Sequence, residues 1–241
     1  MILAAEGVSK SFGALVVLDQ VHFAVGADEA VGIVGPNGAG KTTLLNVLAG
    51  AFAPGAGSVF FRGADVTAAG AAERCRLGVA RSHQVPRPFG GMTAFENVLV
   101  AASAGGGLRG AAAHERCLDS LELCGMLDMA NRRAESLGLL HRKRLELARA
   151  LATGPQVLLL DEIGGGLTDA ESGELVDTIR QLRARGIAIV WIEHMVRVLL
   201  QVVTRLVCMD AGRVLAEGDP AEVMKNAAVI DAYLGQGVAR A

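Results

Sequence analysis

The stretch Gly35-Pro-Asn-Gly-Ala-Gly-Lys-Thr-Thr43 decides how the rest of this 241-residue sequence is interpreted. It matches the phosphate-loop pattern G-x-x-x-x-G-K-[ST], which requires a strand before it and a helix after it. The apolar run 30–34 predicts that strand, and the apolar run 44–48 predicts the helix. A chance glycine-rich turn would lack these flanks, so the stretch predicts a site for a nucleoside triphosphate.

The residues of this loop have separate predicted tasks. Its glycines let the backbone bend tightly, so that successive N–H groups and the positive end of the next helix face an anion. These glycines are Gly35, Gly38 and Gly40. Lys41 is expected to place its charge on the outer phosphates, and the hydroxyl of Thr42 to ligate a magnesium ion that bridges them. Thr43 is expected to add a donor to the first phosphate.

A second motif, Val157-Leu-Leu-Leu-Asp-Glu162, is an apolar segment that ends in two carboxylates. Open α/β sheets bind their ligands beyond the carboxyl ends of the strands. In phosphate-loop ATPases the aspartate at this position holds magnesium, directly or through water, and the next glutamate can polarise the attacking water. We therefore assign Asp161 to the metal and Glu162 to catalysis. The pair alone is weak evidence, and it gains its meaning from the phosphate loop that precedes it.

The composition is that of a protein with a large core and no strong surface charge. Apolar residues make up 51% of the chain, and the net charge of −2 gives no reason to expect a nucleic-acid partner. The longest uncharged window, 42–61, has the length of a membrane span but contains Pro54 and several glycines. We expect a cytoplasmic chain, peripheral on the inner face of the membrane through its partners. The four cysteines form no C-x-x-C pair and are expected to be packing residues.

Strand and helix patterns alternate along most of the chain, which indicates a doubly wound α/β core. Short segments rich in Val, Ile or Leu predict strands at 16–21, 30–34, 58–61, 79–82, 157–161, 188–192, 205–209 and 213–217. Residues 94–153 instead carry helical signals, with a capping box from Thr93 to Glu96 and an amphipathic helix at 111–126. We therefore expect an inserted helical subdomain at 85–153 within one domain, with the ATPase core at 1–84 and 154–241. A last short helix is predicted at 229–234.

Several spaced motifs, covering essentially the whole chain, resemble the ATP-binding subunits of ABC transporters. Phe12 matches the aromatic residue that stacks on adenine, and Gln84 in Arg81-Ser-His-Gln84 matches the glutamine that links the metal site to the helical subdomain. His194 in Trp191-Ile-Glu-His194 matches the switch histidine near the γ-phosphate. The segment 166–169 falls where the dimer-contact loop belongs. The resemblance implies a RecA-like phosphate-loop core with an N-terminal antiparallel β subdomain and the inserted helical subdomain.

The same resemblance implies ATP and Mg²⁺ as ligands and assigns residues to three tasks. Catalysis falls to Lys41, Glu162 and His194. Nucleotide binding falls to Phe12, Val17, Gly35, Asn37, Gly38, Ala39, Gly40, Lys41, Thr42, Thr43, Gln84 and His194. Metal binding falls to Thr42, Gln84 and Asp161.

Within this superfamily the chain looks most like the subunits of importers for branched-chain amino acids and related amides. The stretches that carry this likeness are 81–89, Met92-Thr-Ala-Phe-Glu-Asn97, Leu145-Glu-Leu-Ala-Arg149 and Val229-Ile-Asp-Ala-Tyr-Leu-Gly235. The resemblance implies two membrane permease subunits as partners and, indirectly, a solute-binding protein. It also implies permease contacts near Arg87, Phe89 and Glu96.

One motif departs from the family. The signature Leu-Ser-Gly-Gly-Gln, which donates to the γ-phosphate held by the partner subunit, is here Leu137-Gly-Leu-Leu-His141. Gly138 stands where the serine belongs, and Leu140 replaces a glycine whose backbone must approach phosphate closely. This defect would impair the partner's nucleotide site and leave the chain's own phosphate loop intact. We therefore expect a heterodimer with a second ATPase subunit that carries an intact signature.

Two other functions stay open at this point. A soluble ABC-type ATPase that serves no transporter is one, although the chain has neither a long coiled-coil insertion nor a second ATPase domain. A regulatory subunit that binds ATP and hydrolyses little of it is the other. The altered signature favours the regulatory reading, and the presence of Glu162 and His194 opposes it.

Overall fold

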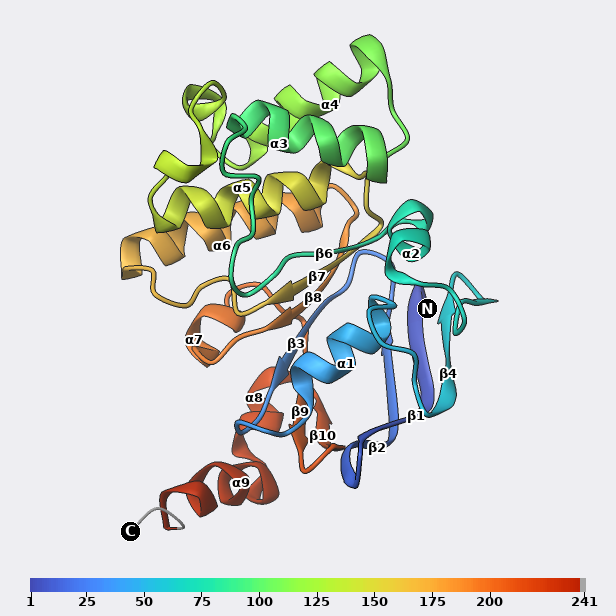
Figure 1. Ribbon diagram of the computed structural model, residues 1–241. Coiled ribbons are helices and arrows are strands. Elements are labelled where there is room, and N and C mark those ends of the chain that lie inside the picture. The colour runs from blue at the N-terminus through green and yellow to red at the C-terminus, as the bar shows by residue number, and fades with distance from the viewer. Residues whose placement is uncertain (239–241) are drawn as a thin grey trace.

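The computed structural model describes residues 1–238, which are built around two β-sheets (Figure 1). The N-terminal sheet is antiparallel, with the strand order β2-β1-β4-β5. Its strands are β1 (Leu3–Phe12), β2 (Leu15–Val25), β4 (Ala56–Phe61) and β5 (Ala64–Asp65). The central sheet has the order β10-β9-β3-β8-β7-β6, and all of its neighbouring strands are parallel except β9 and β10. Its strands are β3 (Ala30–Val34), β6 (Val79–Arg81), β7 (Val157–Asp161), β8 (Ala188–Ile192), β9 (Arg205–Asp210) and β10 (Arg213–Gly218).

Helices cover both faces of the central sheet. Helix α1 lies between the two sheets, while α3 to α6 gather on the other side (Figure 1). The helices are α1 (Lys41–Leu48), α2 (Ala71–Leu77), α3 (Ala94–Val100), α4 (Gly110–Leu123), α5 (Leu139–Ala152), α6 (Asp169–Ala184), α7 (Val196–Leu199), α8 (Pro220–Lys225) and α9 (Ala227–Val238). A π-helical turn at Ala101–Gly105 follows α3, and two 3₁₀ turns, Leu127–Met129 and Ala134–Ser136, precede α5.

The central strands are continuous apolar runs because both of their faces are buried. In β7, Leu158 and Leu160 pack into the core formed with α3 to α6. Their neighbours Val157 and Leu159 pack into the second core, which the N-terminal sheet and α1 complete. Parallel pairing brings the carboxyl ends of β3, β7 and β8 to one edge of the sheet, and that edge holds the functional motifs.

A buried arginine holds the far end of α1 in place. Arg74 of α2 is fully buried, and its guanidinium donates to the carbonyls of Val47 at 2.6 Å and Leu48 at 2.9 Å, which end α1. It also donates to the carbonyl of Val66 at 2.7 Å. Helix α1 therefore has fixed anchors at its carboxyl end, and its amino end carries the phosphate loop.

The predicted α/β class with an N-terminal antiparallel sheet and inserted helices is confirmed. The predicted strands 30–34, 157–161 and 188–192 have the bounds of β3, β7 and β8. Other predicted bounds differ from those of the structure, as three examples show. The first strand prediction began at residue 16 and missed β1, the helix 111–126 ends at Leu123, and the helix 229–234 is part of the longer α9. The subdomain boundaries at 85 and 153 stay a prediction.

Among residues 1–238, none of the helices combines the length and the apolar character that a membrane span requires.

Candidate functional site

The phosphate loop joins β3 to α1 in a conformation that requires glycine at two positions. Gly35 and Gly40 have φ values of 140° and 95°. A Cβ on Gly35 would lie 2.0 Å from the carbonyl oxygen of Met209, and one on Gly40 would lie 2.6 Å from that of Val17. The loop therefore packs closely against β9 on one side and the β1–β2 hairpin on the other.

A cavity of about 200 Å³ opens at this loop. The residues that line it are Val17, Asn37, Gly38, Ala39, Gly40, Lys41, Thr42, Thr43 and Glu162. Every one of these residues belongs to the set predicted from the sequence. Helix α1 begins at this cavity, and the N-terminus of a helix suits a bound phosphate.

Lys41 is folded back onto the loop that carries it. Its side chain is only 6% exposed, and Nζ donates to the carbonyls of Gly35 at 2.7 Å and Pro36 at 2.9 Å. Burial lowers the pKa of Lys41, and the nearby Glu162 opposes that shift. To bind phosphate from this position, the ammonium group would have to exchange these two carbonyls for phosphate oxygens.

Asp161 lies at the end of β7 and is held by groups from two neighbouring elements. Its Oδ1 is 3.4 Å from the Thr42 hydroxyl, and its Oδ2 accepts from Arg81 at 2.8 Å. Arg81 also donates to Asn46, whose amide donates to the Thr42 carbonyl at 2.8 Å. The aspartate is 1% exposed, so Arg81 compensates a fully buried charge. This role of Arg81 could not be predicted from its place in the motif Arg81-Ser-His-Gln84.

The oxygen atoms of Asp161 and Thr42 suit a hard divalent cation, which takes oxygen ligands. In the described chain, 1–238, no three His, Cys, Asp or Glu side chains gather closely enough to bind a metal on their own. A magnesium ion at this edge would need further oxygens, which the phosphates of a nucleotide in the adjoining cavity could supply.

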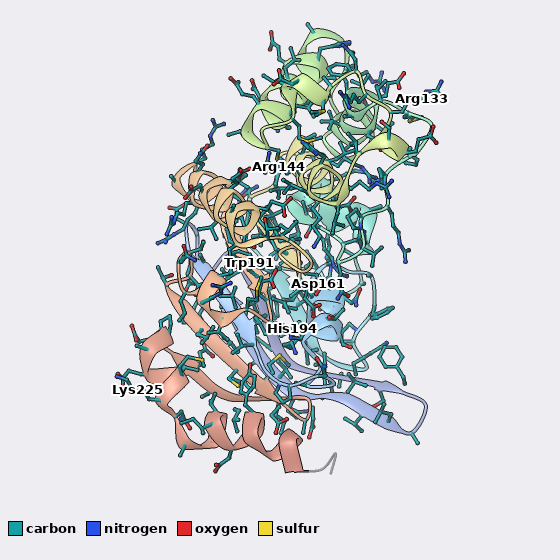
Figure 2. All side chains as sticks on the ribbon, turned by 90° about the vertical axis from the view of Figure 1, so that its left-hand side faces the viewer. Arg133, Arg144, Asp161, Trp191, His194 and Lys225 are labelled. Atoms are coloured by element: carbon teal, nitrogen blue, oxygen red, sulfur yellow. The ribbon has the colours of Figure 1, made fainter. Side chains whose placement is uncertain are left out.

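Glu162 contacts His194, which was predicted to be catalytic, and Gln84, which was predicted to link the metal site to the helical subdomain. The His194 Nε2 atom lies 2.8 Å from one carboxylate oxygen, and the Gln84 amide donates to the other. Glu162 has a φ of 49°, in the left-handed region, which turns the chain sharply after Asp161. Asp161 and His194 both lie at the centre of the molecule, between the helical layer with Arg133 and the C-terminal helices with Lys225 (Figure 2).

Phe12 lies apart from this group. It is 47% exposed at the tip of the β1–β2 hairpin, and its ring packs edge-on against Phe52 at a centroid distance of 5.5 Å. The Lys10 ammonium lies 5.5 Å from the same ring. Its assignment to adenine stays a prediction.

Two buried charges that the sequence analysis missed hold the loop after Glu162. Lys143 of α5 donates to the carbonyls of Ile163, at 2.9 Å, and Gly165. From the other side, the Gly164 N–H donates to the carboxylate of Glu193, which is 3% exposed. Burial raises the pKa of Glu193 and lowers that of Lys143. The sequence signals neither role, because the burial of Lys143 and Glu193 depends on contacts between distant segments.

The altered signature forms the start of α5. Gly138 is the N-cap residue, with extended backbone and no side-chain cap, and Leu139 at the first helical position is 49% exposed. Apart from its sequence neighbours, no atom of the described residues 1–238 lies within 4 Å of a Cβ placed on Gly138. The hydroxyl donor of the usual serine is therefore missing from a position that has room for it.

Comparison with known proteins agrees with this geometry. The ABC transporter family profile matches residues 18–164, and a profile described as branched-chain amino acid ATP-binding cassette transporter matches residues 213–239. A high-affinity branched-chain amino acid transport ATP-binding protein, LivG of Salmonella typhimurium, is 36% identical over 98% of both chains. The lipopolysaccharide export system ATP-binding protein LptB of Acidithiobacillus ferridurans is 36% identical over 97% of both.

Solved structures give the same result. An ATP-binding cassette of an ABC transporter, determined in its ADP conformation, superposes with a TM-score of 0.87 at 29% identity, over 97% of this chain and 98% of that one. Sequence, fold and the arrangement around the phosphate loop therefore agree: the chain is an ATP-hydrolysing member of the ABC transporter ATP-binding family.

Proposed function

We propose that this chain is the ATPase subunit of a membrane importer for branched-chain amino acids or related compounds. The observation that carries the proposal is the match of residues 213–239 to the branched-chain cassette profile, which lies outside the general ABC transporter match. The similarity to LivG over nearly the full length of both chains supports it.

In the proposed mechanism, a nucleotide displaces the internal contacts of the site. Lys41 leaves the carbonyls of Gly35 and Pro36 and binds the outer phosphates. Glu162 orients the attacking water, and His194 keeps the carboxylate aligned through its contact of 2.8 Å. Asp161 and Thr42 would hold a magnesium ion, with Gln84 proposed as a further ligand, and the ion would supply charge neutralisation at the phosphates. ATP binding closes two ATPase subunits head to tail, and hydrolysis reopens them.

The permease contact is proposed at a groove between β6 and α5. Arg81, His83, Arg87, Glu146 and Arg149 line this groove together with smaller residues. The Arg149 guanidinium lies 5.2 Å from the ring centroid of Phe89, which is 47% exposed. Because Arg81 also binds Asp161, a permease segment in this groove would act directly on the metal side of the nucleotide site.

We further propose that the partner ATPase is a different chain. A second copy would offer Gly138 and Leu140 where a serine hydroxyl and a glycine are needed, and the helix dipole of α5 alone is a weaker donor set. The chain alone should therefore turn over ATP more slowly than its mixed complex. Equal turnover by a purified ATP-dependent homodimer would refute this asymmetry.

The similarity to LptB favours one alternative, an ATPase that drives lipopolysaccharide export. A pull-down of the tagged full-length chain from its native membranes in mild detergent, with mass spectrometry of stoichiometric partners, separates the two. We expect a second ATPase, two permeases and an associated amino-acid-binding protein. Recovery of lipopolysaccharide-export components would favour the alternative, and recovery of soluble partners alone would overturn both.

A further inference from the structure

The C-terminal helix contacts the first residue of the phosphate loop. The Tyr233 hydroxyl of α9 accepts a hydrogen bond of 2.8 Å from the backbone N–H of Gly35, although the two residues are 198 positions apart. Figure 1 shows α9 below the loop that joins β3 to α1. Tyr233 is not among the residues predicted to bind nucleotide or metal or to act in catalysis.

Both backbone polar groups of Gly35 are engaged. Its N–H donates to Tyr233, and its carbonyl accepts from the Lys41 ammonium at 2.7 Å. On its third side Gly35 is so close to β9 that a Cβ would collide with the Met209 carbonyl. Helix α9 therefore holds Gly35, the same residue that Lys41 would have to leave in order to bind phosphate.

Helix α9 is buried near its start and partly exposed at Tyr233. Val229 is 1% exposed and fastens α9 to the core, and α9 also lies against α8 and β10. Tyr233 itself is 40% exposed, while its hydroxyl is directed at Gly35. Burial raises the pKa of the Tyr233 phenol, so the group stays neutral at physiological pH.

We propose that Tyr233 is a positioning residue for the phosphate loop. Through this contact, α9 responds to bound nucleotide and increases the affinity of the site for nucleotide. With the hydroxyl in place, Gly35 keeps the geometry that the loop needs before phosphate arrives. Without it, a buried N–H has no partner and the loop must be ordered by the nucleotide itself. This proposal requires only that the chain binds ATP, as its family does, and is independent of the transported substrate.

The sequence offers a direct probe, because Tyr233 is its only tyrosine. Full-length protein grown with 3-fluorotyrosine should give one ¹⁹F resonance, which reports on this residue alone. We expect Mg·ADP to shift that resonance saturably, with a midpoint equal to the Kd from calorimetry. The same titration of Lys41→Ala, at concentrations that saturate the wild type, should show little shift. A resonance that does not move at saturating Mg·ADP would overturn the proposed response of α9.

The second measurement is the affinity of Tyr233→Phe, which keeps the ring and removes only the hydroxyl. We expect its Kd for Mg·ADP and its KM for ATP to rise by roughly three- to tenfold, as for one lost buried hydrogen bond, with kcat little changed. Ile230→Ala, on the same helix and 42% exposed, is the matched control and should change neither constant. Equal affinities of Tyr233→Phe and wild type, or equal losses in both variants, would contradict a specific role of the hydroxyl.

Discussion

The bond between Arg81 and Asp161 allows a quantitative test of how the metal side of the site is built. Its atoms lie 2.8 Å apart, and the two side chains are 12% and 2% exposed. Removing one partner of a buried ion pair typically costs about 3–5 kcal/mol, because the other charge stays buried without compensation. We expect the lower end, about 3 kcal/mol, since the Thr42 hydroxyl, 3.4 Å from Oδ1, remains near the aspartate.

The perturbation is Arg81→Met, measured by thermal unfolding without nucleotide. At about 2–4 °C per kcal/mol for a chain of this size, the melting temperature should fall by roughly 6–12 °C. Arg180→Met is the matched control, because Arg180 pairs with Asp177 at 3.0 Å and both side chains are about half exposed or more. Its cost should stay below about 1 kcal/mol. Adding Asp161→Asn to Arg81→Met should restore part of the lost stability, because the uncompensated charge is then gone. A shift for Arg81→Met no larger than that of the control would refute the reasoning.

Three further predictions concern catalysis, pH and the signature. Glu162→Gln should keep ATP binding and lower turnover by about 10²–10³-fold, measured as phosphate release, whereas wild-type turnover would remove Glu162 from its assigned role. Burial raises the pKa of Glu193 above its ordinary value of 4.5. The folded state therefore binds this proton more tightly than the unfolded state, which stabilises the fold at low pH. The stability advantage of wild type over Glu193→Gln in urea unfolding should therefore shrink as pH rises through that raised pKa, and a growing advantage would contradict this sign. Gly138→Ser, which has room for its Cβ, should change stability by only a few tenths of a kcal/mol and raise ATP turnover in the site that the signature faces. Unchanged turnover in both homodimer and mixed complex would show that the missing hydroxyl is not limiting.

The parts of the fold that could be predicted are those in which one physical requirement dominates. The strands β3, β7 and β8 are buried on both faces, so their sequences are uninterrupted apolar runs with clear ends. Strand β1 escaped prediction because its alternation is broken. Gly7 has a φ of 59°, and the pairing of β1 with β2 shifts register between Ala5 and Val8. Such a bulge moves later side chains to the other face, and a period of two is then lost from the sequence.

The candidate site divides in the same way. The residues that line the cavity could be predicted because a phosphate loop needs glycines, a lysine and a hydroxyl at set spacings. The residues that position them could not, because Arg81, Lys143, Glu193 and Tyr233 act through contacts with segments far away in the sequence. A buried ion pair or a carbonyl acceptor has no spacing rule, so only the folded chain brings these partners together.

These positioning contacts also explain how a chain with an altered signature can keep a complete site of its own. Helix α5 begins at the altered motif, where Gly138 is the N-cap residue and has no side-chain donor to offer the proposed partner. One turn later the same helix holds the loop after Glu162, through the bonds of Lys143 to Ile163 and Gly165. The start of α5 is exposed, where the proposed partner subunit would meet it, whereas Lys143 is buried within this chain. A substitution at the exposed end therefore need not disturb Glu162, the proposed catalytic residue, provided that the buried lysine remains. This separation is what an asymmetric pair of ATPase subunits requires.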